Sequence, residues 1–438
     1  MSITSDGAVG FAGLSHLGIV SSIVAAAKGF SVVGWDLDAD LVSQVQSGSL
    51  PIVEPGLDDL LAEHREQLMF TADISALSAC RLVYVAQDVP TDDSGRSNLD
   101  AVNDLLQRVG VAVKPGTVVV LLSQVPPGFT REAAAELISN SLGSGPELFY
   151  QVETLVFGNA VERALTPERI IVGCPNPGVD RPEALTRYLG AFDCPILPMR
   201  YESAELCKIA INMFLVSTLA TTNMLAELCE MIGAVWEEIA PALRLDRRIG
   251  RYAYLNPGLG VGGGNLLRDV ATVQKTAARH QVDTQLLDAW LANSDHRRDW
   301  VLRAIRHEVL PETTEPVVAV WGLAYKENTG STFRSPALRT IEQLNGVAVR
   351  AYDPAVVLND DRFDNFSQST DPISACQDAD VLAIMTPWPQ FKSVQVAEVA
   401  AAMKGAVVID PYGVLPLDEG KANGLRIFRL GASPPPSV

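Results

Sequence analysis

The sequence has few of the positively charged residues that nucleic-acid-binding proteins carry. Its 438 residues include 34 Lys and Arg against 52 Asp and Glu, a formal net charge of −18. A chain this acidic argues against nucleic acid and anionic membrane as partners. It does not exclude a phosphorylated small molecule, because backbone N–H groups and a few Lys or Arg side chains can form a local anion site.

Cysteine and histidine are also scarce, and they are scattered. No C-x-x-C pair occurs, and no His stands at ligand spacing from a Cys or a carboxylate; the residues are Cys80, Cys174, Cys194, Cys207, Cys229, Cys376, His16, His64, His280, His296 and His307. Isolated thiols of this kind are typical of a reduced protein in which each Cys is a small buried hydrophobe. We therefore predict neither a disulfide nor a metal site.

Long hydrophobic runs are missing as well. No uninterrupted run of 18 apolar residues occurs, so we predict no membrane-spanning helix. The N-terminal "MSITSDGAVGFAG" has no basic region followed by an apolar stretch, so a signal peptide is not expected. Together with the scattered thiols, this predicts a cytoplasmic protein with no membrane partner.

Short apolar runs alternate with helical patterns at both ends of the chain. The first group includes "AVGFAG", "FSVVGWD", "RLVYVAQ", "TVVVLLS" and "RIIVG", and the second "EPVVAVWGLAY", "GVAVRAYDP", "ADVLAIMTP" and "GAVVIDPYG". Alternation predicts parallel sheets covered by helices. Between them, residues 202–243 have apolar residues at three- and four-residue spacing. We predict an α/β fold, with two Rossmann-like doubly wound domains at 1–200 and 311–438 joined by a helical region at 201–310.

The stretch "GLSHLG", residues 13–18, lies between the first apolar run and a helical pattern. This is the position of the G-x-G-x-x-G dinucleotide fingerprint, with Ser15 as its middle residue. Asp36, at the end of "FSVVGWD", stands where a carboxylate binds the ribose hydroxyls and repels a 2′-phosphate, which favours NAD. The predicted cofactor site comprises Gly13, Ser15, His16, Leu17, Gly18 and Asp36. The alternative is an α/β turn that binds nothing.

A glycine-rich stretch, "GLGVGGGNLLRD" at 258–269, has five glycines within seven positions and ends in Asp269. Backbone this bare allows another group to come close. In "ELCKIAINMF", Lys208 and Asn212 stand at i and i+4, on one helix face. Lys208 is either a surface residue on an apolar stripe or, beside Asn212 and Asp269, part of a cluster suited to proton transfer. "LPIVEPGLDDLL" (50–61) and "LLSQVPPG" (121–128) read only as turns.

Together these stretches, with "DRRIG", "GLAYKENT" and "RSPAL", resemble the UDP-glucose/GDP-mannose dehydrogenase family from about residue 8 to about residue 415. The resemblance implies an N-terminal NAD-binding domain, a central region that forms a homodimer, and a C-terminal domain for a UDP- or GDP-linked sugar. Members of this family oxidise a sugar alcohol to a carboxylate with two NAD. A Cys in the glycine-rich loop traps the intermediate aldehyde, and the resulting thioester is hydrolysed.

The resemblance also implies roles for individual residues. Lys208, Asn212 and Asp269 match groups that assist alcohol deprotonation and hold the oxyanion, and Glu153 in "QVETLVFG" matches the first Glu of a P-E-F-L-R-E-G stretch. Ser123 matches a cofactor contact. The predicted substrate contacts are Arg248, Tyr254, Gly260, Gly262, Gly263 and Lys326.

Several family residues are replaced. Asn265 stands in the position of the catalytic Cys, and Phe157 in that of the second Glu of P-E-F-L-R-E-G. Gln124 replaces the Thr of an S-T-V-P loop, and we include Gln124 and Asn265 among the catalytic candidates. Gln87, Asp88, Val89 and Pro90 replace a V-G-T-P stretch near the cofactor. Phe333 replaces an Arg that can touch NAD, and Arg334 beside it becomes the candidate contact.

The replacements divide the family reaction in two. Lys208, Asn212 and Asp269 can support one hydride transfer, whereas the nucleophile and the hydrolytic carboxylate of the second half are absent. We therefore predict a two-electron oxidation that stops at a ketone or aldehyde, as on an enlarged sugar such as an octose in lincosamide-type antibiotic biosynthesis. Two alternatives stay open: a four-electron oxidation through a hydrated aldehyde, and a non-catalytic paralogue that binds NAD and a nucleotide sugar. The sequence leaves the nucleotide, the sugar and the oxidised carbon undetermined.

Overall fold

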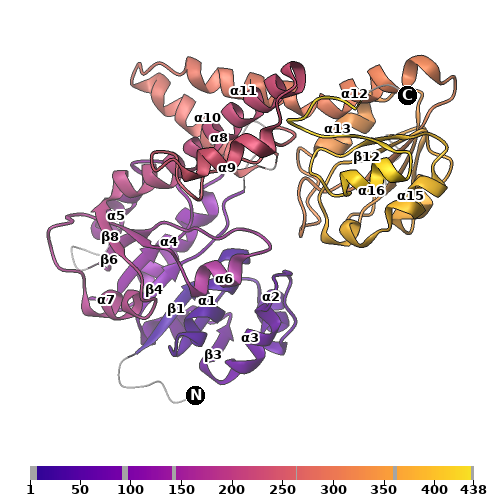
Figure 1. The fold of residues 1–438 in the computed structure, drawn as a ribbon. Helices are drawn as coiled ribbons and strands as arrows, with labels where there is room; N and C mark the ends of the chain where they lie inside the picture. The colour runs from indigo at the N-terminus through magenta and orange to yellow at the C-terminus, as the bar shows by residue number, and fades with distance from the viewer. Residues whose placement is uncertain (1–6, 91–96, 141–144, 263, 359–362, 436–438) are drawn as a thin grey trace. The chain divides into compact units, whose positions relative to one another are not determined.

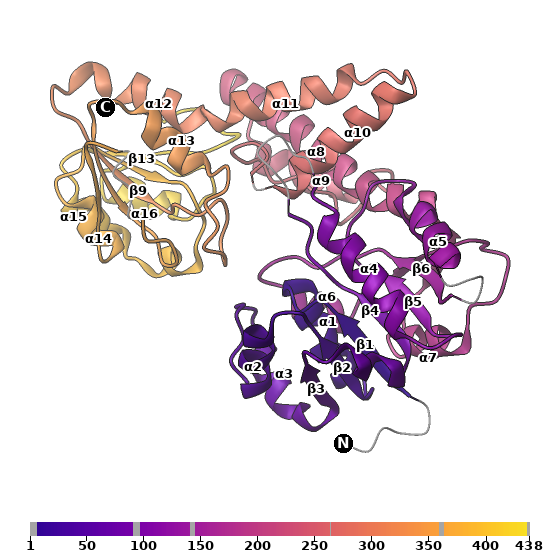
Figure 2. The ribbon, with the colours of Figure 1, turned by 180° about the vertical axis from the view of Figure 1, so that it is seen from behind.

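The computed structural model describes residues 7–90, 97–262, 264–358 and 363–435, apart from 141–144. The chain divides into two compact units, Met1–Ile211 and Asn212–Val438. Each unit contains one sheet with helices packed against it (Figures 1 and 2). Predicted residue Gly263 lies outside the described residues.

The first unit contains an eight-stranded sheet in the order β3-β2-β1-β4-β5-β6-β7-β8. Its first six strands follow the order of a dinucleotide-binding Rossmann fold. All neighbours run parallel except β6 and β7, which are antiparallel. The strands are β1 (Ala8–Ala12), β2 (Val32–Trp35), β3 (Leu68–Thr71), β4 (Cys80–Val85), β5 (Val118–Leu121), β6 (Glu147–Gln151), β7 (Ile170–Cys174) and β8 (Ile196–Arg200).

Helices cover both faces of this sheet, because successive strand residues point to opposite sides. In β4, Leu82 and Tyr84 pack with α1 and α7, whereas Val83 and Val85 pack with α4 and α5. The helices are α1 (His16–Ala27), α2 (Ala39–Ser47), α3 (Leu57–Glu63), α4 (Asp100–Ala112), α5 (Phe129–Asn140), α6 (Ala160–Leu165) and α7 (Glu183–Gly190), with 3₁₀ turns η1 (Arg65–Gln67) and η2 (Ile74–Ala79).

The predicted long central helix is α8 (Tyr201–Ile232), which ends before Gly233 and continues as α9 (Trp236–Leu245). We expected no membrane-spanning helix. By length and composition alone, however, α8 is long and apolar enough to be one, since an 18-residue window has a mean hydropathy of 1.5. Interrupting polar residues hid this stretch from a search for uninterrupted runs. Several of them make contacts inside the protein: Glu205 accepts from the amides of Gly128 and Thr130, and Glu230 from Arg297 and Trp300. One helix of this kind is weak evidence for a membrane span, and 33% of this window is buried inside the protein.

The second unit continues with α10 (Asn265–Arg279), α11 (Gln285–Arg298), α12 (Trp300–Glu308) and η3 (Leu310–Glu312), then forms a six-stranded parallel sheet. The order β11-β10-β9-β12-β13-β14 repeats that of the first six strands of the other unit. Its elements are β9 (Val317–Trp321), α13 (Pro336–Gln343), β10 (Ala348–Tyr352), β11 (Phe366–Gln368), α14 (Pro372–Cys376), β12 (Val381–Ile384), η4 (Pro389–Ser393), α15 (Val396–Ala402), β13 (Val407–Ile409), α16 (Leu417–Ala422) and β14 (Arg426–Phe428).

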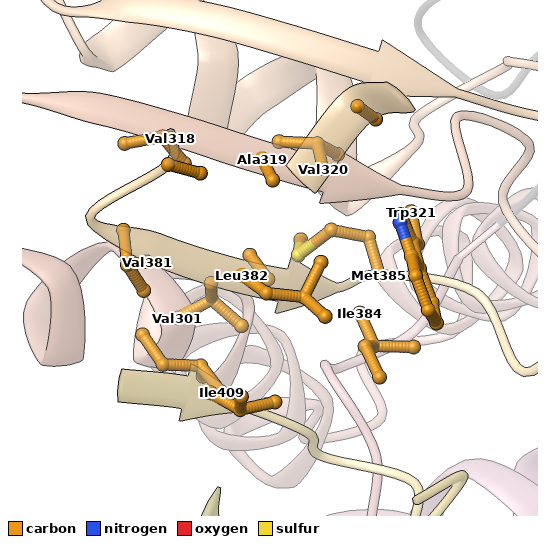
Figure 3. Packing of buried hydrophobic residues seen from close by; sticks show 14 of the residues in the cluster. Val301, Val318, Ala319, Val320, Trp321, Val381, Leu382, Ile384, Met385 and Ile409 are labelled. Carbon is orange, nitrogen blue, oxygen red and sulfur yellow. The ribbon is translucent and has the colours of Figure 1, made fainter. Parts of the chain in front are cut away.

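The core of this sheet is largely aliphatic, with a few aromatic rings such as those of Trp321 and Phe391. Figure 3 shows Val318 and Val320 of β9, Leu382 and Ile384 of β12 and Val301 of α12 packed together, all at most 1% exposed. Continuous apolar strands of this kind are expected where a parallel sheet is covered on both faces. The α/β fold with two Rossmann-like sheets is therefore confirmed, and β6–β7 is the one antiparallel pairing among the described strands of the first sheet.

Candidate active site

The turn between β1 and α1 is built around Gly13 and Gly18. Gly13 has φ +94°, a left-handed conformation that favours glycine. A Cβ on Gly18 would lie 1.8 Å from the carbonyl oxygen of Gly13, so only glycine lets α1 begin so close to the strand. The Ser15 hydroxyl donates to Ala86 O (3.0 Å) and accepts from Asp88 N (2.9 Å). The hydroxyl is thus hydrogen-bonded within the protein, and these two bonds join the turn to the residues that follow β4.

Asp36 lies at the end of β2 with two of its lone pairs engaged. Oδ2 accepts from Leu14 N (2.6 Å) and Oδ1 from Asp38 N (2.9 Å). A carboxylate has about four acceptor sites, so Asp36 can hold the turn and still accept from a ribose hydroxyl. Ser123 lies just after β5 and is buried. Its hydroxyl accepts from Gln87 N (3.1 Å), which follows β4, and half-buried Gln124 is the next residue.

Lys208 and Glu153 form a partly buried pair within the first unit. Lys208 Nζ donates to the backbone oxygen of Glu153 (2.8 Å) and lies 3.6 Å from its carboxylate. Burial raises the pKa of Glu153; Lys208 lowers it, and nearby Asp88 raises it. These contacts argue against a surface Lys208 and place it beside Glu153, whereas its place in a cluster with Asn212 and Asp269 stays a prediction. The Lys208 side chain is only 13% exposed and is held beside a carboxylate.

Asn212 and Asp269 meet within the second unit. Asn212 stands one turn after Lys208 on α8, and its Nδ2 lies 2.5 Å from Asp269 Oδ2. Arg268 Nε lies 3.2 Å from Asp269 Oδ1. Asp269 is 1% exposed and Arg268 is also buried. The carboxylate is therefore fixed from two sides, with a positive charge beside it.

Three polar residues that the sequence reasoning missed hold the glycine-rich loop. Gly258 N donates to Asn223 Oδ1 (2.8 Å), Val261 N donates to Ser294 Oγ (2.8 Å), and Arg298 Nη2 donates to Val261 O (3.3 Å). The three are buried, on α8 and α11. The sequence offered one signal for these residues, a polar side chain within an apolar helical pattern. That signal is not specific, because polar residues occur in such helices without binding a loop.

Close packing requires a glycine at one position of the loop, Gly260. A Cβ on Gly260, which has φ +76°, would lie 2.4 Å from Ser294 O. At Gly262 it would lie 3.4 Å from the Tyr325 ring, and at Gly264 3.4 Å from the Phe333 ring. The loop thus runs against α11 and against the segment that follows β9. Of these three positions, only Gly260 has no room for a Cβ, since 3.4 Å is an ordinary van der Waals contact.

The remaining predicted residues fall at different places in the second unit. Asn265 is the first residue of α10 and is exposed. Lys326 lies beside Tyr325, with Nζ 5.8 Å from its ring centre, so it is next to the glycine-rich loop. Exposed Arg334 has φ +53°, and half-exposed Tyr254 precedes the loop. Arg248 is 89% exposed and makes a two-pronged pair with Asp246 (2.6 and 3.0 Å).

Cysteine and metal chemistry find no support in the described parts of the chain. All six cysteines are unpaired, and burial raises the pKa of Cys80 and of Cys376 to about 12, which disfavours their thiolates. Among the described residues, no group of three His, Cys, Asp or Glu side chains could hold a metal ion.

Models of the UDP-glucose/GDP-mannose dehydrogenase family match most of the chain. The NAD-binding domain of that family matches residues 8–186, its central domain residues 202–295 and its UDP-binding domain residues 319–416. Among curated relatives, UDP-glucose 6-dehydrogenase TuaD of Bacillus subtilis is 29% identical over 96% of this chain and 92% of its own length. UDP-glucose 6-dehydrogenase of Rhizobium meliloti is also 29% identical, over 96% and 98%.

Solved structures agree on the fold. A UDP-glucose dehydrogenase from Pyrobaculum islandicum superimposes with a TM-score of 0.82 at 26% identity, covering 98% of both chains. A UDP-D-ManNAc dehydrogenase from Pyrococcus horikoshii gives 0.80 at 24% identity, over 97% and 99%. The second likeness bears on the fold alone.

Proposed function

Because the chain belongs to the UDP-glucose/GDP-mannose dehydrogenase family and is an NAD-dependent nucleotide-sugar dehydrogenase, we propose that it performs one two-electron oxidation and stops at a carbonyl. The alcohol carbon gives a hydride to NAD⁺, and the hydroxyl proton goes to a base of the protein. The products are a ketone or aldehyde, NADH and a proton.

Three polar side chains support the first hydride transfer. Lys208 stands on the same helix as Asn212, one turn away, and Asn212 is bonded to buried Asp269. We assign Lys208 and Asp269 to removal of the hydroxyl proton and Asn212 to holding the oxygen. Positioned acid–base groups of this kind typically accelerate proton transfer by about 10²–10⁴-fold. Glu153, which follows β6, is bonded to Lys208 of α8 and adds a carboxylate whose pKa is raised by burial.

The observation that carries the stop at a carbonyl is Asn265. An amide can donate and accept hydrogen bonds, but it cannot form the covalent adduct from which a second hydride would leave. Phe157 adds to this, because it places a hydrocarbon ring where the family resemblance expects a hydrolytic carboxylate. A nucleophile and its hydrolytic partner are both missing, which leaves the first oxidation intact and the second without its machinery.

For the substrate, we propose a nucleotide sugar whose oxidised carbon carries a secondary alcohol. A ketone there cannot become an acid, so a thiol would have no use. The match to a UDP-binding domain favours UDP over GDP as the nucleotide. An enlarged sugar, such as an octose on a route to lincosamide-type antibiotics, has such an alcohol and stays the specific proposal.

The test is a panel of UDP- and GDP-linked sugars incubated with NAD, with a hydroxylamine trap for carbonyl products. We expect an oxime of a ketone or aldehyde and no carboxylate in the mass spectrum. A carboxylate as the accumulating product supports instead a four-electron reaction through a hydrated aldehyde, held by Asn265 in place of the thiohemiacetal. In that case Asn265→Cys changes the rate and leaves the product the same.

We further propose that the protein is a cytoplasmic homodimer with no membrane partner, organised as an NAD-binding domain (1–200), a dimerising helical region (201–310) and a nucleotide-sugar domain (311–438). Apolar side chains of α8 support the dimer, since Phe214 is 75%, Met231 80% and Ile232 66% exposed in the single chain. Light scattering after chromatography tests it. Phe214→Asp is expected to shift the mass from dimer to monomer, whereas a monomeric wild type contradicts the dimer.

A further inference from the structure

A buried carboxylate, Glu54, occupies the stretch "LPIVEPGLDDLL" that the sequence marked only as a turn. Its side chain is 1% exposed. Oε1 lies 2.8 Å from His16 Nε2, and both oxygens lie 3.0 Å from Gly158 N. Oε2 also accepts from Ala160 N (3.1 Å). A buried carboxylate is costly unless it is hydrogen-bonded in this way.

Glu54 therefore touches two parts of the first unit that are far apart in sequence. His16 is the first residue of α1, whose N-terminus is where a Rossmann fold seats the pyrophosphate of its dinucleotide. Gly158 and Ala160 lie a few residues after Glu153 in the sequence. One side chain thus lies between the cofactor turn and the candidate catalytic segment.

The segment from Glu153 to Gly158 is held at both ends. At its start, Lys208 binds the backbone oxygen of Glu153. At its end, Glu54 binds Gly158 N, and the ring of Phe157 lies against that of His16 with centres 4.4 Å apart. Movement of His16 therefore reaches this segment by two routes, the carboxylate of Glu54 and the ring of Phe157.

We propose that His16 and Glu54 form a link through which bound NAD fixes the segment 153–160, with Glu54 as a positioning residue that does not itself touch substrate. NAD on the first turn of α1 restrains His16. His16 restrains the carboxylate, and the carboxylate restrains the amides of Gly158 and Ala160. The link depends on NAD binding alone and stands whether oxidation stops after two electrons or four.

Hydrogen exchange measured by mass spectrometry tests the link without any sugar substrate. In the full-length wild type, NADH at saturating concentration is expected to slow exchange in peptides covering 153–160 by roughly fivefold or more, the effect of securing about one hydrogen bond. In Glu54→Gln the amide side chain presents only one acceptor oxygen, so the ratio of exchange with and without NADH is expected to fall toward one. Glu63→Gln, an exposed carboxylate on the neighbouring α3, is the matched control and should keep the wild-type ratio.

His16 variants keep the test decisive if Glu54→Gln does not fold. His16→Ala is expected to lose the NADH-dependent slowing at 153–160, measured at saturation for that variant. His16→Gln restores part of it, since its amide can donate to Glu54. Two results overturn the link: no slowing by NADH in the wild type, or a variant that raises exchange equally with and without NADH, which is the signature of a purely structural contact.

Discussion

Residues 153–158 of the first unit and 258–269 of the second each include one hydrogen-bonded carboxylate and one residue that is at least partly exposed. Glu153 is bound by Lys208, and Asp269 is bound by Asn212 and Arg268. In contrast, Phe157 is 46% exposed and Asn265 is exposed at the start of α10. The held residues match the family pattern, and the open ones depart from it.

The two kinds of position are expected to differ in how much a substitution lowers the stability of the fold. Replacing a buried, bonded carboxylate disturbs the structure around it, whereas an exposed position can change with little effect on folding. On the proposed function, substitution at Asn265 is therefore expected to change the reaction at little cost in stability. The four predictions below test this contrast, beginning with the largest effect.

Lys208→Ala is expected to lower kcat for NAD reduction by about 10²–10⁴-fold, because it removes the amine that we assign to proton removal. The measurement is steady-state NADH formation with the nucleotide sugar that the wild type oxidises. Lys114→Ala, an exposed lysine of the same unit, is the control and should keep wild-type kcat. A Lys208 variant with near-normal kcat contradicts the assignment.

Asp269→Asn is expected to lower the free energy of unfolding by about 3 kcal/mol, because it removes the charge that compensates buried Arg268. Urea denaturation at neutral pH measures the change. Asp104→Asn is the comparison, since the side chains of Asp104 and its partner Arg108 are 50% and 47% exposed, and the loss should be less than about 1 kcal/mol. Equal losses in the two variants would remove the distinction between held and exposed carboxylates.

Glu153→Gln is expected to change the pH dependence of stability. Burial raises the pKa of folded Glu153 above its unfolded value, so its contribution is fully present below the unfolded pKa and is lost as pH rises through the folded pKa. The variant lacks this titration and should gain stability relative to the wild type as pH rises across that window. Unfolding free energies at several pH values test this, and parallel profiles contradict it.

Asn265→Ala is expected to leave the free energy of unfolding within about 0.5 kcal/mol of wild type, because the side chain is exposed. The same variant should lower kcat/KM by about fivefold, the loss of one hydrogen bond to the reacting oxygen. Denaturation and kinetics on one preparation give both numbers. A large loss of stability shows that Asn265 is a structural residue.

The sequence predicted most of the interior strands and missed the strands at the sheet edges. Residues of β1, β2, β4, β5 and β9 form continuous apolar runs, because both faces of a parallel strand are buried. The missed strands β3, β11 and β14 lie at sheet edges and have three or four residues, and edge strand β8 contains a proline. The interior strand β6 was also missed, and its sequence ELFYQ begins and ends with polar residues. Short edge strands have too few residues to show a period.

The candidate site was also only partly predicted from the sequence. Spacing along one helix was enough to place Lys208 and Asn212 on a common face. The contacts of Glu54, Asn223, Ser294 and Arg298 join residues that are 33 to 106 positions apart in the sequence, and no local pattern encodes such distances. "LPIVEPGLDDLL" therefore read as a turn although it holds a buried carboxylate.

The most direct measurement is the ratio of NADH formed to nucleotide sugar consumed when the sugar is limiting. A single two-electron step predicts one NADH per sugar and a product that has lost two hydrogens. Two NADH per sugar, with a carboxylate as product, contradicts the assignment of Asn265 as the residue at which oxidation stops.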